Sequence, residues 1–468
     1  MKIVLNRITY KLLNNGKIAF CLVLICLLGT LSCKKFIEVD PPVNRLVTSN
    51  VFEDDRTANA AMLGLYSNYT GHGFSGGGTA GISFLSAMSS DELRFLNESF
   101  MVIIEFNENA VLASSQWVYD LWNFSYLDIY GCNSILEGLD KSSKITSNLK
   151  NQLKGEAKFL RAYTHFFLVN MFGKIPYVST TDFEKNTLAS RMETDEVYNL
   201  IVQDLKDSKE LLSSEYSFSN GRKSRVNKYA ASALLARIYL YMGKYSEAEA
   251  EATNVITSQV YSLGDLNSAF LIDNGEAIWQ LESPPGINFT QDGSQFVNNQ
   301  SEQTLTTGLI GSFESVDLRL QNWILQYDVD KYAPNKYKDG GTSTTSKEAN
   351  TILRLAEQYL IRAEARAKEN NLVGANSAVS DLNIIRNRSG LSNSSAVTQE
   401  QVLIAIETER RHELFTEGHR WFDLKRTGKV DAVMSPLKPD WAPSDKLYPI
   451  PLQETLINPN MKQNPGYN

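Results

Sequence analysis

The chain has 468 residues, of which 43% are hydrophobic and 21% charged, a composition typical of a folded globular protein and not of a disordered one. Its formal net charge is −7, which argues against DNA or RNA as a partner, and we expect no nucleic acid to bind. A chain of this length can bury a substantial core without disulfide bonds.

Residues 1–32 differ in kind from the rest of the chain. They open with a basic stretch that has no acidic side chain and that carries Lys2, Arg7, Lys11 and Lys17. The apolar run that follows, 18–31, is shorter than the about 20 residues of a membrane-spanning helix and fits a secretory signal. Ser32 then precedes Cys33, as in lipoprotein signals that are cut before a lipidated cysteine. We therefore predict a cleaved signal at 1–32 and a lipid anchor on Cys33. The alternatives are a plain membrane anchor and a secreted chain.

Amphipathic helices dominate the remaining sequence. The spacing of apolar side chains predicts helices over 57–69, 115–139, 149–171, 194–212, the pairs 226–258 and 350–388, and 399–417. Cys132 falls in an apolar stretch of the second of these helices, so we expect a buried and unreactive thiol.

The pair 226–258 has the pattern of a tetratricopeptide unit. Its apolar and small positions are Leu235, Ala236, Tyr239 and Ala248, and Gly243 supplies the turn. The pair 350–388 repeats the pattern more weakly, with Ala363 and Ala375 at the same spacing. These features predict an all-α fold with a tetratricopeptide-like helical repeat scaffold, interrupted by insertions and a few short strands.

Two loop-rich insertions interrupt the helices, at 70–114 and at 260–348. The first begins with the glycine-rich segment 71–78, which lacks the strand and the Lys-Ser/Thr of a phosphate loop. The second contains a polar stretch, 283–303, and short extended runs within 313–347. Long loops in a compact domain are uncommon and often functional, so we expect the ligand site here.

The segment 409–429, ERRHELFTEGHRWFDLKRTGK, is dense in charge and begins a zinc-protease pattern at His412-Glu413. The second histidine comes at 419 and not at 416, and two helical turns, roughly 10 Å, separate the two imidazoles. We therefore interpret the segment as a structural network of ion pairs. Glu409, Glu413 and Glu417 share one helix face, and basic side chains follow them.

Five segments together resemble hallmarks of the SusD/RagB family of nutrient-binding outer-membrane lipoproteins: 155–178, 354–370, 381–390, 409–429 and 447–467. The resemblance implies one SusD-like domain over 33–468, with no catalytic residue and no cofactor. It also implies a glycan ligand and a SusC-like TonB-dependent transporter as partner. The implied location is the outer membrane, lipid-anchored and facing the cell exterior, although acidic residues after Cys33 are sparse. A peptide or protein ligand is the alternative, and a glycoside hydrolase is a further one that no motif supports.

Candidate ligand contacts are aromatic side chains on the insertions, because a ring can cover the apolar face of a sugar. Trp323 and Tyr327 are the first candidates, although Trp323, Leu325 and Tyr327 could instead share one face of a strand. Irregular segments add Phe74, His72, Phe289 and Phe296. Asp91 and Arg94 could supply polar contacts, and a solvated turn is their alternative role. We expect no metal site.

Overall fold

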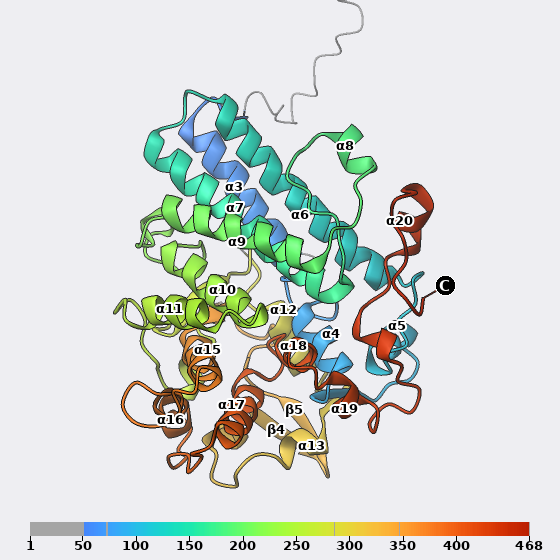
Figure 1. The fold of residues 1–468 in the computed structure, drawn as a ribbon, viewed down its shortest axis with the longest axis vertical. Helices are drawn as coiled ribbons and strands as arrows, with labels where there is room; N and C mark the ends of the chain where they lie inside the picture. The colour runs from blue at the N-terminus through green and yellow to red at the C-terminus, as the bar shows by residue number, and fades with distance from the viewer. Residues whose placement is uncertain (1–50, 72–73, 285, 346, 468) are drawn as a thin grey trace, which may run out of the picture. The chain divides into compact units, whose positions relative to one another are not determined.

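Helices make up most of the fold in the computed structural model, which describes residues 51–71, 74–284, 286–345 and 347–467 (Figure 1). The predicted signal at 1–32, the lipidation site Cys33 and the candidate His72 lie outside these ranges. Within them, no helix combines the length and apolarity needed to cross a membrane. The residues from Val51 onward form one compact unit.

Long helices of the N-terminal half pack side by side: α3 (Asp55–Gly71), α6 (Gln116–Lys141), α7 (Ser147–Phe172) and α9 (Thr194–Leu211). α7 lies between α6 and α9 and is buried along most of its length. At Gly155 the chain comes so close to the end of α9 that an added Cβ would lie 2.7 Å from Cγ of Leu212. Shorter elements connect these helices: α4 (Ile82–Ser89), β1 (Leu93–Phe95), α5 (Met101–Asn107) and α8 (Phe183–Thr187).

The tetratricopeptide-like pair is confirmed as α10 (Lys228–Tyr241) and α11 (Tyr245–Ile256). The Asn227 side chain caps α10 by accepting from the N–H of Ala230 at 2.9 Å. Gly243 turns the chain with φ +69°, a conformation that favours glycine. Ala236 and Ala248 are fully buried, so the two helices approach closely.

The second pair differs from its prediction at its start. Residues 350–354 form a strand, β6 (Asn350–Arg354), which pairs antiparallel with β2 (Ala277–Leu281), and the helices are α15 (Leu355–Lys368) and α16 (Ala378–Arg388). A strand partner about 70 positions away overrides the local helical pattern. Ala363 is buried as predicted, whereas Ala375 is exposed in the connecting turn and Ala378 takes the buried position.

The C-terminal part contains α17 (Gln399–Leu414), α18 (Arg420–Arg426), α19 (Val430–Met434) and α20 (Leu452–Ile457). α17 ends earlier than predicted because Thr416 and Gly418 adopt positive φ angles of 54° and 79°. Apolar side chains of α15, α16 and α17 form a second core beside the main one.

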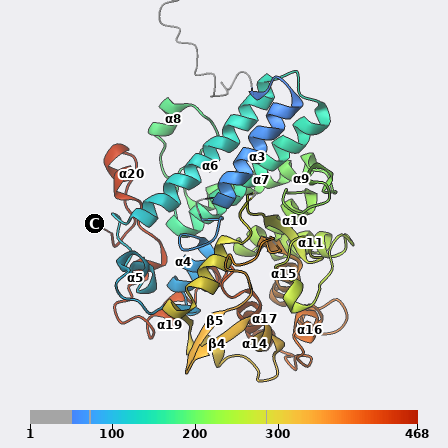
Figure 2. The same ribbon diagram turned by 180° about the vertical axis from the view of Figure 1, so that it is seen from behind.

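Besides β2, the insertion 260–348 contains the short elements α12 (Gln291–Gly293), a π-helix (Ser294–Asn298), β3 (Gln303–Leu305), α13 (Thr307–Ile310), α14 (Leu318–Asn322), β4 (Ile324–Asp328) and β5 (Lys331–Pro334). Of these, α14, β4 and β5 lie at one end of the molecule (Figure 2). Short 3₁₀ turns occur at Ser217–Ser219, Leu266–Ser268, Gln300–Glu302 and Pro443–Lys446. β4 and β5 form a hairpin, and β3 pairs with β1.

Candidate functional site

The charged segment 409–429 lies in the interior and forms a network of ion pairs. The carboxylate of Glu413 contacts the guanidinium groups of Arg354 at 2.6 Å, Arg319 at 3.2 Å, and Arg388. Burial opposes the ionisation of Glu413, but the charges of Arg388, Arg354 and Arg319 outweigh it and hold its pKa well below the ordinary value. This carboxylate therefore forms ion pairs within the fold and is not available to a ligand.

Other pairs extend the network across the C-terminal part. Arg410 and Arg426 share Asp423 at 3.0 and 2.7 Å, and Arg420 contacts Asp91 at 2.7 Å. These contacts join α17 and α18 to one another and to the segment between α4 and β1, which confirms the structural interpretation of the motif. Lys425 is an exception, since its ammonium donates to the carbonyl of Asn170 and contacts no carboxylate within the described chain. Burial lowers the pKa of Lys425 to about 7.

The two histidines of the segment have separate environments. The ring of His412 stacks on Phe313 with centroids 4.0 Å apart, and its Nε2 lies 2.8 Å from the Ser312 hydroxyl. His419 occupies the N-cap position of α18 without a capping hydrogen bond from its side chain, and its Nδ1 lies 3.9 Å from the Glu357 carboxylate. Burial lowers the pKa of both imidazoles, to about 3 for His412. Across the described ranges, no group of three or more His, Cys, Asp or Glu side chains is arranged to hold a metal ion.

The two predicted insertions meet in a small patch of strands. β1 comes from the first insertion and β3 from the second, and they pair antiparallel with Arg94 opposite Thr304. Side chains alternate along β1, so that Leu93 and Phe95 are buried and Arg94 is exposed. Neither insertion alone could form this surface.

The hairpin β4–β5 extends this surface. The backbone N–H of Tyr332 on β5 donates to the Thr304 hydroxyl at 2.9 Å, and the Tyr327 hydroxyl on β4 donates to the carbonyl of Gln303 at 3.0 Å. Both tyrosines are partly buried, and Tyr332 packs against the main core. We call the region where β1, β3, β4 and β5 meet the strand face, defined by Arg94, Thr304, Tyr327 and Tyr332.

The strand face combines aromatic and cationic groups that remain available to a ligand. The Arg94 guanidinium forms no hydrogen bond or ion pair with any other residue that the structure describes, and its side chain is exposed on β1. The hydroxyl of Tyr327 is anchored to Gln303, which fixes its ring. A fixed, partly exposed ring and free guanidinium donors suit a ligand with apolar faces and hydroxyl rims.

Trp323 is a core residue, which corrects its prediction as a surface contact. Its side chain is 0% exposed, and its Nε1 donates to the carbonyl of Leu266 at 2.9 Å. The Lys336 ammonium lies 4.7 Å from its ring centroid. Trp323 is the C-cap residue of α14 and precedes β4. Of the three side chains that could have shared one face of a strand, Leu325 and Tyr327 therefore lie in β4 and Trp323 does not.

Three further candidates are also buried. Phe74 packs between Tyr163 and Phe167, and Phe296 lies 6.3 Å from Phe84. Asp91 is bound by Arg420 and Arg411. Burial opposes its ionisation, but the hydrogen bond from Arg420 and the charge of Arg411 outweigh it and lower the pKa of Asp91. Phe74 and Asp91 lie in irregular segments and Phe296 in the π-helix, and all three side chains are buried, so an irregular or short element in the sequence did not indicate exposure.

Phe289 is half-buried against the Gly340–Gly341 turn, where an added Cβ on Gly341 would lie 3.0 Å from its ring. Tyr327 and Arg94 are the two predicted residues that the structure places on strands in contact with β3. Sequence reasoning missed Tyr332 and Thr304. The run Tyr327-Asp328-Val329-Asp330-Lys331-Tyr332 carried a usable signal, because a polar turn between two tyrosines is typical of a hairpin.

Comparisons with known proteins agree with this architecture. A family model described as "Starch-binding associating with outer membrane" matches residues 76–240, and the SusD family model matches 286–467. A SusD-like protein from Formosa agariphila is 24% identical over 93% of this chain and 96% of its own length. The starch-binding protein SusD from Bacteroides thetaiotaomicron is 24% identical over 75% of this chain and 78% of its own.

Solved structures share the fold. A SusD superfamily protein from Parabacteroides distasonis has a TM-score of 0.79 at 24% identity, with 90% of this chain and 100% of that one covered. A laminarin-binding SusD-like protein has a TM-score of 0.75 at 25% identity, with 89% and 100% covered. The fold and the strand face thus define a mostly helical repeat scaffold that joins two insertions into one surface. The chain belongs to the SusD/RagB family.

Proposed function

We propose that the protein is an outer-membrane lipoprotein that binds oligo- or polysaccharides on the strand face and delivers them to a SusC-like TonB-dependent transporter. One observation carries the proposal: the partly exposed Tyr327 is hydrogen-bonded to β3, and the unpaired Arg94 lies on β1, the strand that pairs with β3, so aromatic and cationic groups of both insertions meet at the strand face. Membership of the SusD/RagB family supports it, as do the ligands named for relatives, starch for one and laminarin for another.

The chemistry of binding follows from the side chains of the strand face. A sugar ring that covers Tyr327 removes apolar surface from water, worth about 25 cal/mol per Å². Arg94 donates to the hydroxyl rim. Tyrosine loses little rotamer freedom on binding, so a few such contacts give millimolar to micromolar affinity. Binding of this kind involves no bond cleavage, and the lipoprotein acts without catalysis.

Replacement of Tyr327 by alanine tests the proposal. We expect Tyr327→Ala to weaken binding of laminarin oligosaccharides, or of the polysaccharide that retards the protein most in affinity gels, by about 1–3 kcal/mol. Isothermal titration calorimetry gives the affinity, and thermal melting checks that the fold is retained.

Tyr130→Ala is the matched control, because Tyr130 is 53% exposed on α6 and remote from the strand face. It should leave glycan affinity unchanged. Retention of a peptide with no retardation on any glycan would favour the peptide-binding alternative. Release of shorter sugars from an oligosaccharide would instead identify a hydrolase.

A further inference from the structure

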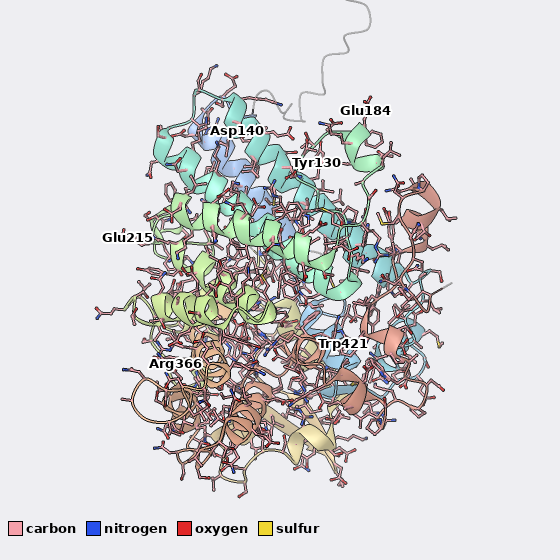
Figure 3. All side chains as sticks on the ribbon, in the orientation of Figure 1. Tyr130, Asp140, Glu184, Glu215, Arg366 and Trp421 are labelled. Atoms are coloured by element: carbon pink, nitrogen blue, oxygen red, sulfur yellow. The ribbon has the colours of Figure 1, made fainter. Side chains whose placement is uncertain are left out.

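A second surface site lies on α6, at the opposite part of the molecule from the strand face. It is a cavity of about 310 Å³ between α6, the segment 176–189 that carries α8, and the C-terminal segment that carries α20. We call it the aromatic groove. Figure 3 labels Tyr130 on α6 near α8, which carries Glu184.

Aromatic side chains form one wall of the groove. Trp122, Tyr126 and Tyr130 follow one another at four-residue spacing along a single face of α6, and the first two rings lie 4.9 Å apart. Trp122 is almost fully buried, whereas Tyr130 is 53% exposed. Phe183 of α8 stands across the groove with 78% of its side chain exposed.

Ile457 lines the groove, and further exposed aliphatic side chains lie on the elements that form it or next to them. Leu127 lies on α6, Leu188 follows α8, and Leu456 and Ile457 lie on α20, each with more than half of its surface exposed. Several exposed apolar side chains on neighbouring elements favour an interaction site. The rim therefore points to a partner that covers aliphatic surface.

One carboxylate, that of Glu454, faces this apolar setting. Among the described residues that line the groove, it is the sole acidic side chain, and Lys, Arg and His are absent. Glu454 forms no ion pair within the described chain. Burial raises its pKa, partly offset by a hydrogen bond from Trp122. The guanidinium of the nearby Arg191 donates to the carbonyls of Lys174 and Lys462 and forms no ion pair with Glu454.

The walls of the groove are fixed by hydrogen bonds. The Tyr126 hydroxyl donates to the carbonyl of Pro176 at 2.8 Å. Asn458 donates to the carbonyl of Ala189 at 2.9 Å, which ties the α20 segment to the α8 segment. A groove that is preformed costs little ordering when a ligand enters.

We propose that the aromatic groove binds a lysine or arginine side chain of an extended peptide segment from a protein partner. The aliphatic stem lies along Trp122, Tyr126 and Tyr130, and the cationic head meets the Glu454 carboxylate. Leucine-like neighbours in the peptide cover the aliphatic rim. A neutral sugar would leave both the carboxylate unpaired and the rim uncovered, so the observations favour the basic peptide.

Matched peptides test this proposal independently of glycan binding. The probes are fluorescein-labelled hexapeptides with leucine and phenylalanine around one central lysine, arginine, norleucine or glutamate, titrated into the purified protein by fluorescence polarisation. We expect the lysine and arginine peptides to bind at least about tenfold more tightly than the norleucine peptide, and the glutamate peptide to bind weakest.

Variants of the chain locate the site. Glu454→Gln should remove the preference for lysine over norleucine, and Tyr130→Ala should weaken both peptides. Glu184→Gln is the control, because Glu184 is an exposed carboxylate on α8 outside the groove lining. Tyr327→Ala should leave every peptide affinity unchanged, which separates this site from the strand face.

Three results would each overturn the proposal. Failure of every lysine and arginine peptide to bind is one. Equal affinity for the lysine and norleucine peptides in the native protein is another, since Glu454 would then play no part. A loss of glycan binding in Tyr130→Ala would assign the groove to sugar instead.

Discussion

Glu413 draws together three distant parts of the chain. Its carboxylate contacts Arg319 in α14, Arg354 at the end of β6 and Arg388 at the end of α16. All four side chains are almost fully excluded from solvent. A buried charge is tolerated only with partners, so each member of such a cluster depends on the others.

Removal of the central charge should therefore be costly. We expect Glu413→Gln to lower the free energy of unfolding by about 3–5 kcal/mol at neutral pH, because three buried guanidinium groups lose a shared anion. The pKa of Glu413 is depressed in the folded state, so its contribution is present above pH 4.5, the ordinary value, and is lost as pH falls toward the folded value. Urea unfolding should show the difference between the two proteins shrinking between pH 6 and pH 3.

Glu193→Gln provides the comparison, because its ion pair with Lys174 lies at the surface, with side chains 63% and 52% exposed. It should change stability by less than about 0.5 kcal/mol. Equal effects of the two substitutions on stability would contradict the structural role of the ion-pair network in segment 409–429.

Trp323 and Tyr327 show what the sequence could and could not predict at single positions. Both stand in one loop-rich segment, and nothing local distinguishes a ring that packs under Lys336 from one that borders solvent. Whether each ring is buried or borders solvent depends on contacts with Leu266 and Gln303, whose carbonyls accept hydrogen bonds from Trp323 and Tyr327. Such partners are distant in sequence, so the ligand candidates were the least predictable part of the molecule.

Helices were predictable where their signals are local. The periodicity of α6, α7 and α10 and the small residues of the tetratricopeptide-like pair lie within single windows of sequence. β6 was predicted as helix, because its pairing with β2 depends on residues far away in the chain. The pairing of β1 with β3, which forms part of the strand face, could not be predicted from local sequence for the same reason.

Two glycines within helices should respond in opposite ways to alanine. An added Cβ on Gly155 of α7 would lie 2.7 and 2.8 Å from Cγ and Cδ2 of Leu212, whereas Gly64 of α3 has nothing within 4 Å. We expect Gly155→Ala to destabilise the protein by about 1–3 kcal/mol through overpacking. Gly64→Ala should stabilise it by about 0.5–1 kcal/mol through helix propensity.

Chemical denaturation of both variants measures these changes, and each serves as the control for the other. Stabilisation by Gly155→Ala would mean that α7 and the end of α9 are not in close contact.

The two candidate surfaces occupy different parts of the fold. The hairpin β4–β5 lies at one end of the long axis, and α8 lies toward the other end in both views (Figures 1 and 2). The helix α18, which carries part of the buried ion-pair network, lies between these two ends, and α17 lies beside the hairpin (Figure 1). A rigid body of this kind can hold a ligand on one surface and a partner on another at the same time.

Anchoring of the chain is a property of Cys33, which lies outside the described residues. We expect Cys33→Ala to abolish lipidation and to move the protein from the membrane fraction to the soluble fraction on cell fractionation. Metabolic labelling with a fatty acid analogue gives the matching readout. Continued membrane fractionation of an unlabelled Cys33→Ala protein would show that the anchor lies elsewhere.

The central claim is that the strand face binds a glycan. A crystal structure of the protein with a laminarin oligosaccharide, or with the glycan it binds most tightly, tests this claim most directly. We predict a sugar ring stacked on Tyr327 and a hydroxyl within hydrogen-bond distance of the Arg94 guanidinium. A sugar bound at the aromatic groove, with the strand face empty, would contradict it.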